Sequence, residues 1–395
     1  MVNCDPSQMG APVENQHDDR AEGNDRRVSG SSPAPLRVAW LYPLPKRRIL
    51  SGMAAGSEPD QLSAISRIAR YGVSPHLVDP LPFPLNPFAR RHSLYSGIDA
   101  LRALRVASSL RRYDVILSVG ESSALVLLWL KRLLGFRTPI VVWDPALGGE
   151  WPVRERILRY VLPRADRVLV VGANQANFIT QIYGGNCRVA VIHHWEDTSF
   201  FAPQHAASDG YILSVGNDVA RDFATLVDAV ATLPCEIVIK TNRRIKRADD
   251  LPPNVRVVAE RISFEALRDL YARARFVVIP IKKAVHASGV NSILEAMAMG
   301  KATIVSDSPG ICDFVRNGEN SIVVPPGDPD ALSRAIATLL ADPTQAEKLG
   351  RRARTFVEAN FSLDRFAERL AAELASAHRI AAESHGRLAA RANRQ

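Results

Sequence analysis

The sequence predicts an α/β protein made of two doubly wound domains that face each other across a cleft. Three observations lead to this prediction: continuously apolar strand segments, helical segments between them, and a restart of the same rhythm after a linker near 200–210. Apolar strands alternating with helices are typical of a parallel sheet covered on both faces. A chain of 395 residues is also long enough for two hydrophobic cores.

Six strands are expected in the first half of the chain, each marked by a short run of branched or aromatic residues. They cover 36–42, 73–79, 114–120, 139–144, 166–172 and 187–194. Helical stretches lie between them, beginning with a helix expected over 59–71.

Six more strands are expected after the linker, again with helices in the gaps. They cover 211–216, 236–240, 254–260, 275–280, 302–307 and 321–326. Because ligands bind beyond the carboxyl ends of the strands in open α/β sheets, the two sheets should present these ends to a shared cleft.

Four regions follow from these patterns. Residues 1–35 are polar and rich in Gly, Ser, Asp and Arg, and a disordered tail is expected there. The first domain should cover 36–202 and the second 203–362, followed by a helical tail over 363–395 that is rich in Ala and Arg.

Composition limits the classes of function. The net charge of +9 favours anionic partners, but the basic segment 90–112 has few interleaved aromatic residues, which argues against nucleic acid. The four cysteines are far apart in the sequence, and their spacing fits neither a metal site nor a disulfide framework.

The N-terminus lacks an apolar signal core, so a reduced, cytoplasmic setting is expected. The apolar stretch 124–136 is too short to span a membrane and is interpreted as a core helix with a basic edge, or alternatively as a helix on a membrane surface.

The segment most suggestive of chemistry runs from Ala287 to Gly310. Gly289 lies just before a helix expected over 291–299, where unpaired amides and the helix dipole would attract phosphate. Glu295, one turn into that helix, could accept two hydrogen bonds from a ribose diol. In the alternative interpretation, Ser288 or Asn291 caps the helix and Glu295 is solvated or ion-paired. Lys282 and Lys283 in the preceding loop either face phosphate or are solvated.

Several segments together resemble one family. The sequence SGVNSILEAMAMGK and its continuation to Pro343 are similar to the C-terminal signature of family 4 glycosyltransferases, which have the GT-B fold of two Rossmann-like domains. The segments RADRVLVVGANQANFI, VIHHWEDTSFFAP, ILSVGNDVARDFATLVDAV and NVRVVAERISFEALRDLYARARFVVIP resemble further parts of that pattern. The likeness covers most of the chain.

The resemblance implies transfer of a sugar from a nucleotide-diphosphate donor to an acceptor hydroxyl, with retained anomeric configuration. It implies no metal and no cofactor, the nucleotide sugar being a co-substrate. The acceptor would be a polysaccharide, a glycolipid or a small glycoside.

The resemblance also assigns roles to single residues. Glu295 would hold the donor ribose, Arg221 would neutralise the leaving phosphate, and Arg261 falls where the family meets the base. The remaining donor-binding residues are Ser288, Gly289 and Val290, through their amides, with Asn291 and Lys282.

The sequence departs from the family pattern at several positions. Ala287 stands where the first Glu of the Glu-x7-Glu motif would lie, and Asn217 replaces an Arg. The histidine expected after the strand at 139–144 is absent, and Asp144 is the candidate catalytic residue there. Three alternatives therefore stay open: a nucleotide-sugar-binding or partner-binding protein with impaired catalysis, a sugar-nucleotide epimerase, and a peripheral enzyme at the inner membrane face with a lipid-linked acceptor.

Two apparent metal motifs are given another interpretation. Asp328 and Asp330 form an Asp-x-Asp, but they precede a helical segment, which favours N-capping. The second apparent motif is a set of one cysteine and three histidines: Cys187, His193, His194 and His205. Their spacing is not that of a zinc site, and they are expected in the crevice between the domains.

Overall fold

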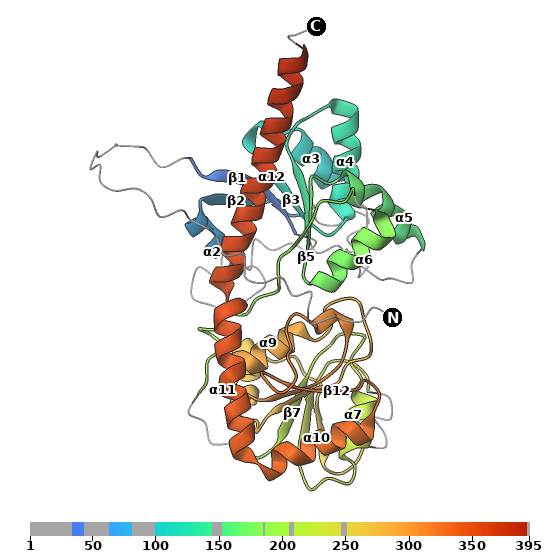
Figure 1. Cartoon of the computed structure of the whole chain (residues 1–395), viewed down its shortest axis with the longest axis vertical. Coiled ribbons are helices and arrows are strands. Elements are labelled where there is room, and N and C mark those ends of the chain that lie inside the picture. The colour runs from blue at the N-terminus through green and yellow to red at the C-terminus, as the bar shows by residue number, and fades with distance from the viewer. Residues whose placement is uncertain are drawn as a thin grey trace, which may run out of the picture.

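The computed structural model describes residues 34–42, 63–80, 99–143, 152–184, 186–204, 209–245 and 251–392. It contains two six-stranded parallel sheets, one in each half of the chain (Figure 1). Each strand expected from the sequence overlaps an observed strand, so the predicted fold class is confirmed. Most of segment 1–35 lies outside the described residues, and its disorder stays a prediction.

The first sheet has the order β2-β1-β3-β4-β5-β6. Its central strands are buried on both faces, which explains their continuously apolar sequences. The strands are β1 Leu36–Leu41, β2 Val73–Leu77, β3 Val115–Val119, β4 Ile140–Trp143, β5 Arg167–Val170 and β6 Val189–Val191. Four helices pack on one face: α3 Ala100–Ala107, α4 Ser122–Leu134, α5 Pro152–Val161 and α6 Ala173–Tyr183. Helix α2 Ser63–Ile68 packs on the other face.

The second sheet has the order β12-β11-β10-β7-β8-β9, the strand order of a dinucleotide-type doubly wound domain. Its strands are β7 Ile212–Val215, β8 Ile237–Lys240, β9 Val255–Val258, β10 Val277–Ile279, β11 Thr303–Ser306 and β12 Ile322–Val324. Helices α8 Phe264–Arg273 and α9 Val290–Ala298 cover one face. Helices α7 Phe223–Val230 and α10 Pro329–Ala341 cover the other.

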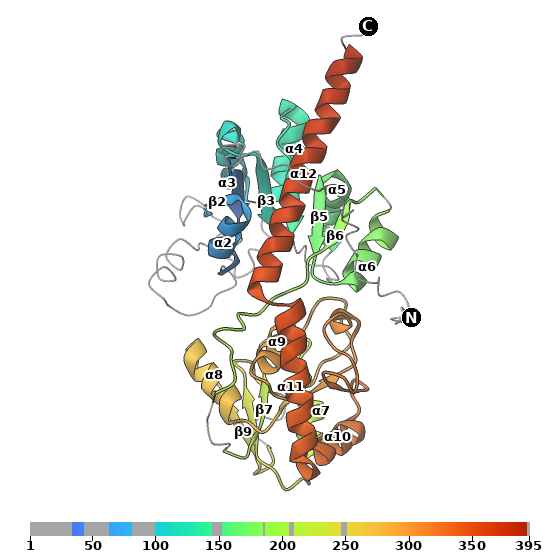
Figure 2. The same cartoon turned by 60° about the vertical axis from the view of Figure 1, so that its left-hand side comes forward.

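The C-terminal helices cross from the second domain back to the first (Figures 1 and 2). Helix α11 Pro343–Asn360 packs on the second domain, and α12 Leu363–Ala392 runs along the first. Phe366, Leu370 and Leu374 of α12 are buried in the core of the first sheet. The expected helical tail is thus observed over Leu363–Ala392, but it completes the first domain, which the sequence did not indicate.

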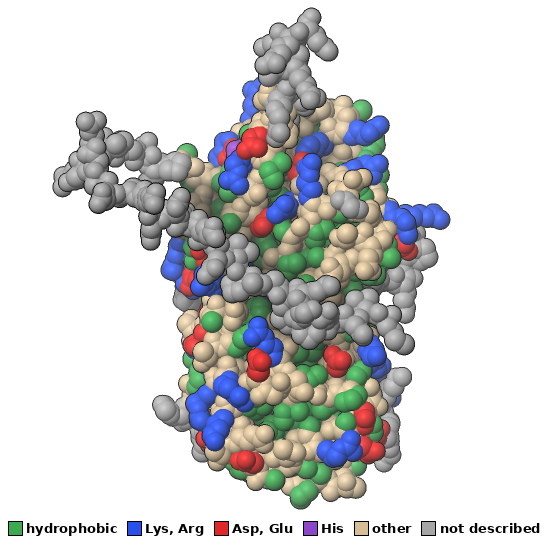
Figure 3. Space-filling model, in the orientation of Figure 1, with side chains coloured by type: hydrophobic (Ala, Val, Ile, Leu, Met, Phe, Trp, Pro, Cys, Tyr) green, Lys and Arg blue, Asp and Glu red, His purple; other side chains and the backbone are tan. Residues whose placement is uncertain are grey.

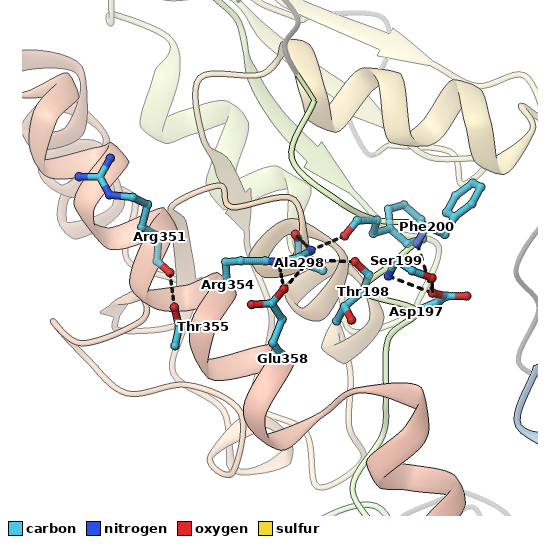
Figure 4. A network of polar contacts seen from close by, with 10 residues as sticks. Asp197, Thr198, Ser199, Phe200, Ala298, Arg351, Arg354, Thr355 and Glu358 are labelled. Carbon is cyan, nitrogen blue, oxygen red and sulfur yellow. Dashed lines mark hydrogen bonds and ion pairs between the residues drawn. The ribbon is translucent and has the colours of Figure 1, made fainter. Parts of the chain in front are cut away.

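The chain passes between the domains twice, once in the linker that follows β6 and once between α11 and α12. These two segments hydrogen-bond to each other. The Glu196 amide donates to the Phe361 carbonyl at 2.8 Å, and the Leu363 amide donates to the Glu196 carbonyl at 3.1 Å. Arg354 of α11 donates to the carbonyls of Thr198 and Phe201 in the linker, and to the Ala298 carbonyl at the end of α9 (Figure 4). The linker is therefore fixed to the helix that carries Glu295.

Replacing Leu370 by Ala tests whether α12 is part of the first core. Because Leu370 is fully buried, L370A should lower the free energy of unfolding by about 2–5 kcal/mol. Urea unfolding followed by tryptophan fluorescence measures this core, since Trp40, Trp143 and Trp195 lie in it. The exposed Arg379 on the same helix provides the control, and R379A should change stability by less than about 0.5 kcal/mol. Equal effects of the two variants would show that α12 is a dispensable tail.

Candidate functional site

The candidate site lies at the switch point of the second sheet. Strands β7 and β10 are neighbours, but the chain leaves them toward opposite faces, through α7 and α9. The two loops that follow these strands meet, since Arg221 forms an antiparallel bridge with Ile281. The Asp222 amide donates to the Pro280 carbonyl at 3.0 Å. This is the position at which doubly wound sheets bind ligands.

Helix α9 begins at this point without a side-chain cap. Gly289 has a φ of 81°, and a Cβ there would lie 2.8 Å from Cδ1 of Ile281. No side chain accepts a hydrogen bond from the first turn, so the capping interpretation for Ser288 or Asn291 is wrong. Among the described residues, the amides of Gly289, Asn291 and Ser292 have no acceptor. They form a surface of hydrogen-bond donors suited to an anion.

Two of the amides expected to contact diphosphate already donate within the loop. The Ser288 amide donates to the His286 carbonyl at 2.7 Å. The Val290 amide lies 3.5 Å from the Ala287 carbonyl, a weaker contact. An anion at this helix end would therefore contact the amides of Gly289 and Asn291 rather than that of Ser288.

Arg221 brings a buried positive charge to the start of α9. Its side chain is only 7% exposed, and Nη2 donates to Oγ of Ser292 at 2.7 Å. Nε and Nη1 are buried and have no partner among the described residues. Burial lowers the pKa of Arg221 to about 10, so the group stays protonated at neutral pH. Gly216 makes room for it, because a Cβ there would lie 2.0 Å from Nε of Arg221.

Glu295 lies in the same helix and is 8% exposed. The hydroxyl of Tyr271 in α8 donates to its Oε2 at 2.7 Å. Burial raises the pKa of Glu295, whereas the Tyr271 hydrogen bond and the charge of Arg221 oppose the rise. Sequence reasoning missed Tyr271, since an aromatic residue on an amphipathic helix gives no signal beyond core packing.

Glu196 in the linker is a second buried carboxyl close to Glu295. Burial, and then the charge of Glu295, raise the pKa of Glu196 well above its usual range. One opposing contact is the hydrogen bond from the Asp197 amide to Oε1 of Glu196, at 2.9 Å. No sequence pattern indicates this pair, because its members are 99 positions apart.

Asp218 adds an ionised carboxylate beside the start of α9. It accepts hydrogen bonds from Oγ of Ser288 at 2.6 Å, from the Ala220 amide at 2.8 Å, and from Nε2 of His286 at 3.3 Å. Burial alone would raise the pKa of Asp218, but these donors hold it well below its usual range. The Ser288 side chain, expected near the donor, therefore orients Asp218.

The remaining predicted residues lie around this centre or outside the described residues. Lys282 is exposed, and its amide donates to the Ala220 carbonyl at 2.8 Å. Arg261 is exposed in the loop between β9 and α8. Asp144 and His205 fall outside the described residues.

The first domain contacts the site through the linker and α6. His194 hydrogen-bonds the exposed side chain of Asn291; burial lowers the pKa of His194 to about 4, so its imidazole is neutral at physiological pH. Nδ2 of Asn174 donates to the Val285 carbonyl, and the Ala173 amide donates to Asp313, both at 2.6 Å. The expectation that a histidine of this group lies between the domains is thus confirmed for His194.

The two alternative metal motifs can be compared with the structure. Asp328 accepts a hydrogen bond from the Ala331 amide at 2.8 Å and caps α10, so the capping interpretation is confirmed. Within the described ranges, no three His, Cys, Asp or Glu side chains gather as a metal site would require.

Comparison with known proteins points to one family. A family model described as Glycosyltransferase Family 4 matches residues 38–200, and one described as Glycosyl transferases group 1 matches residues 211–342. The two matches together cover both sheets.

Individual proteins agree with these matches. The lipopolysaccharide core biosynthesis mannosyltransferase LpcC of Rhizobium leguminosarum is 27% identical over 54% of this chain and 65% of its own length, so the chain spans less than two thirds of that relative. The sucrose-phosphate synthase of Thermosynechococcus elongatus superposes with a TM-score of 0.68 at 20% identity, over 85% of this chain and 97% of its own. The Anabaena protein HepE, solved in complex with UDP and glucose, has a TM-score of 0.64 at 16% identity, over 86% and 100%.

The buried carboxyls give a pH dependence with a defined sign. The pKa values of Glu196 and Glu295 are raised in the folded state, so stability should fall as pH rises from about 4.5, the ordinary value, through the raised values. Glu196→Gln should flatten this fall in urea unfolding measured across pH.

Asp218→Asn is the control, because Asp218 should change stability with pH in the opposite direction. The pKa of Asp218 is lowered in the folded state, so its carboxylate adds stability that is lost as pH falls. The variant should lack that loss. If Glu196→Gln leaves the pH dependence of stability unchanged, Glu196 is not a buried acid with a raised pKa.

Proposed function

Because the chain belongs to the family 4 glycosyltransferases of the GT-B fold, we propose that it transfers a hexose from a nucleoside-diphosphate donor to an acceptor hydroxyl. The observation that best supports this proposal is the pair of unpartnered buried donors of Arg221 beside the uncapped start of α9. A buried charge with open hydrogen-bond donors is costly unless an anion completes it. A diphosphate supplies both the negative charge and the acceptor oxygens.

The reaction develops charge where these donors lie. The bond between the anomeric carbon and the diphosphate oxygen breaks, and the acceptor oxygen forms a new bond to that carbon. The acceptor proton leaves with the nucleoside diphosphate, whose negative charge grows in the transition state. Arg221 and the amides of Gly289 and Asn291 would stabilise that charge without reorganising. We propose that the reaction retains the anomeric configuration and needs no metal ion.

The donor would extend from the diphosphate site along α9 and the neighbouring loops. Glu295 would accept hydrogen bonds from the ribose, its orientation fixed by Tyr271. Arg261 would lie near the base. The solved complex of HepE contains UDP and glucose, which favours a nucleoside-diphosphate hexose as the ligand class.

The transferred sugar needs polar partners at the end of the diphosphate. Ala287, which replaces the family's first Glu, packs against the core and offers no such group. Asp218 and His286 are polar side chains that lie beside this start of α9 in the described loops. The name of LpcC, a lipopolysaccharide core mannosyltransferase, favours a glycolipid or polysaccharide acceptor.

Arg221→Met separates the role of this charge in catalysis from its role in folding. Methionine fills a similar volume without a buried charge, so the free energy of unfolding should stay equal or increase. Transfer should fall by about 100-fold or more, because one pre-aligned group that stabilises the leaving charge is lost. The exposed Arg256 provides the control, and R256M should keep full activity. Unchanged kcat in R221M would remove Arg221 from the mechanism.

Glu295→Gln tests the ribose assignment by thermal shift. UDP-, GDP- and ADP-sugars are screened, because a ligand that binds the native state raises its melting temperature by mass action. The variant keeps an acceptor for Tyr271 but loses charge-assisted hydrogen bonding, so its affinity for the preferred nucleotide should fall by about tenfold. Glu196→Gln removes a neighbouring carboxyl and should keep wild-type affinity. If E295Q binds every nucleotide as the wild type does, Glu295 does not hold the ribose.

A further inference from the structure

Helices α3 and α4 present a hydrophobic surface to solvent. Most of the large hydrophobic side chains that are exposed among the described residues lie on these two helices. Leu101 and Leu104 come from α3, and Trp129, Leu133 and Leu134 come from α4; we name this set the α3–α4 patch. Trp129 is 55% exposed and Leu133 64%. Single exposed apolar residues are ordinary, but a set of this size on adjacent helices indicates an interaction surface.

The two helices lie side by side on the same face of the first sheet. They pack against each other, and their opposite sides are buried in the core of the first sheet. In α3 the buried residues include Ala103 and Val106, and in α4 they include Leu127 and Leu130. The patch thus lies opposite the sheet and away from α12, which packs on the other face.

Arginines outnumber acids in the segment that carries the patch. Residues 99–143 contain three acids, and each is buried or paired. Asp99 is buried with Arg102 at 2.9 Å, Asp114 pairs with Arg37 at 2.7 Å, and Glu121 is buried. The exposed arginines of this segment are Arg105, Arg111, Arg112, Arg132 and Arg137. Figure 3 shows basic side chains over both halves of the face that it draws, on which α12 lies.

We propose that the α3–α4 patch docks on the surface of an anionic lipid bilayer. Trp129, Leu133 and Leu134 would enter the boundary between headgroups and acyl chains, while Arg132 and its basic neighbours contact lipid phosphates. Trp and Leu flanked by Arg is the composition of helices that lie in a membrane interface. Among the described helices, none has the length and apolar character of a membrane span.

Helices α3 and α4 start at the carboxyl edge of the first sheet, which faces the second domain (Figures 1 and 2). Leu101 and Leu104 lie in the first turns of α3, near this edge, whereas Leu133 and Leu134 end α4 at the opposite edge. The docking itself does not depend on the transfer reaction, so vesicle binding tests it without donor or acceptor.

Vesicle flotation of the full chain provides the test. The probes are vesicles of equal parts phosphatidylglycerol and phosphatidylcholine, compared with pure phosphatidylcholine. The wild type should float with the anionic vesicles and bind more weakly as salt rises, because screening reduces the arginine contribution. A triple variant, Trp129→Ser with Leu133→Ser and Leu134→Ser, should bind about tenfold more weakly or worse.

Two controls distinguish the patch from general charge and from misfolding. Arg334→Glu changes the charge of an exposed site in the second domain and should bind like the wild type, whereas Arg132→Glu should weaken binding. If the triple variant does not fold, lipids brominated on their acyl chains give an independent measurement. They should quench the wild type more than Trp129→Tyr, because Trp129 contacts the acyl region.

Three outcomes would overturn the proposal. The wild type could fail to float with anionic vesicles. The triple variant could float as well as the wild type. The wild type could instead form a dimer that the triple variant abolishes without any vesicle binding, which would identify a second copy of the chain as the partner.

Discussion

The guanidinium of Arg221 lies at the centre of the candidate site, and the loops after β7 and β10 and the first turn of α9 are arranged around it. It is buried, protonated and bonded through one nitrogen to Ser292, while two further donors have no partner among the described residues. Two glycines make this position accessible. A side chain at Gly216 would collide with the guanidinium, and one at Gly289 would approach Nη1 to 3.3 Å. The crossing of the loops after β7 and β10 then sets the guanidinium against the first turn of α9, so positive charge and helix dipole point at the same space.

The linker determines how the first domain meets this centre. Arg354 ties the linker carbonyls to the end of α9, and Glu196 is bonded on both sides to the return crossing at 361–363. Trp195 of the linker stacks on Phe366 of α12 with ring centroids 3.8 Å apart. Movement of one domain relative to the other would therefore act on both connecting segments together, because they are hydrogen-bonded to each other. Asn174 contacts the Val285 carbonyl and His194 contacts Asn291, so the first half of the chain reaches the segment at 285–291.

The sequence predicted the strands well because parallel strands buried on both faces must be apolar throughout, and that pattern is local. It indicated Gly289 and the start of α9 because these follow a strand, at a position where doubly wound sheets bind ligands. Arg221 came only from the resemblance to the family. The sequence could not predict the partners of Glu295. Tyr271 lies 24 positions away, and Glu196 lies in a different domain crossing, so their approach follows from tertiary packing alone. The sequence also could not predict where α12 packs, because the pattern of an amphipathic helix does not indicate which hydrophobic core its apolar face covers.

Charged side chains are buried in both halves of the described chain, and one group of them lies at the ligand edge of the second sheet. Burial disfavours the charged forms of Arg221, Glu295 and Glu196, as the directions of their pKa shifts indicate. Elsewhere in the described chain, a buried charge such as Arg102 has its own ion pair with Asp99. Arg221 instead keeps two buried donors without a partner among the described residues, beside an uncapped helix. This arrangement is what a site requires when the acceptor oxygens arrive with the substrate and leave with the product.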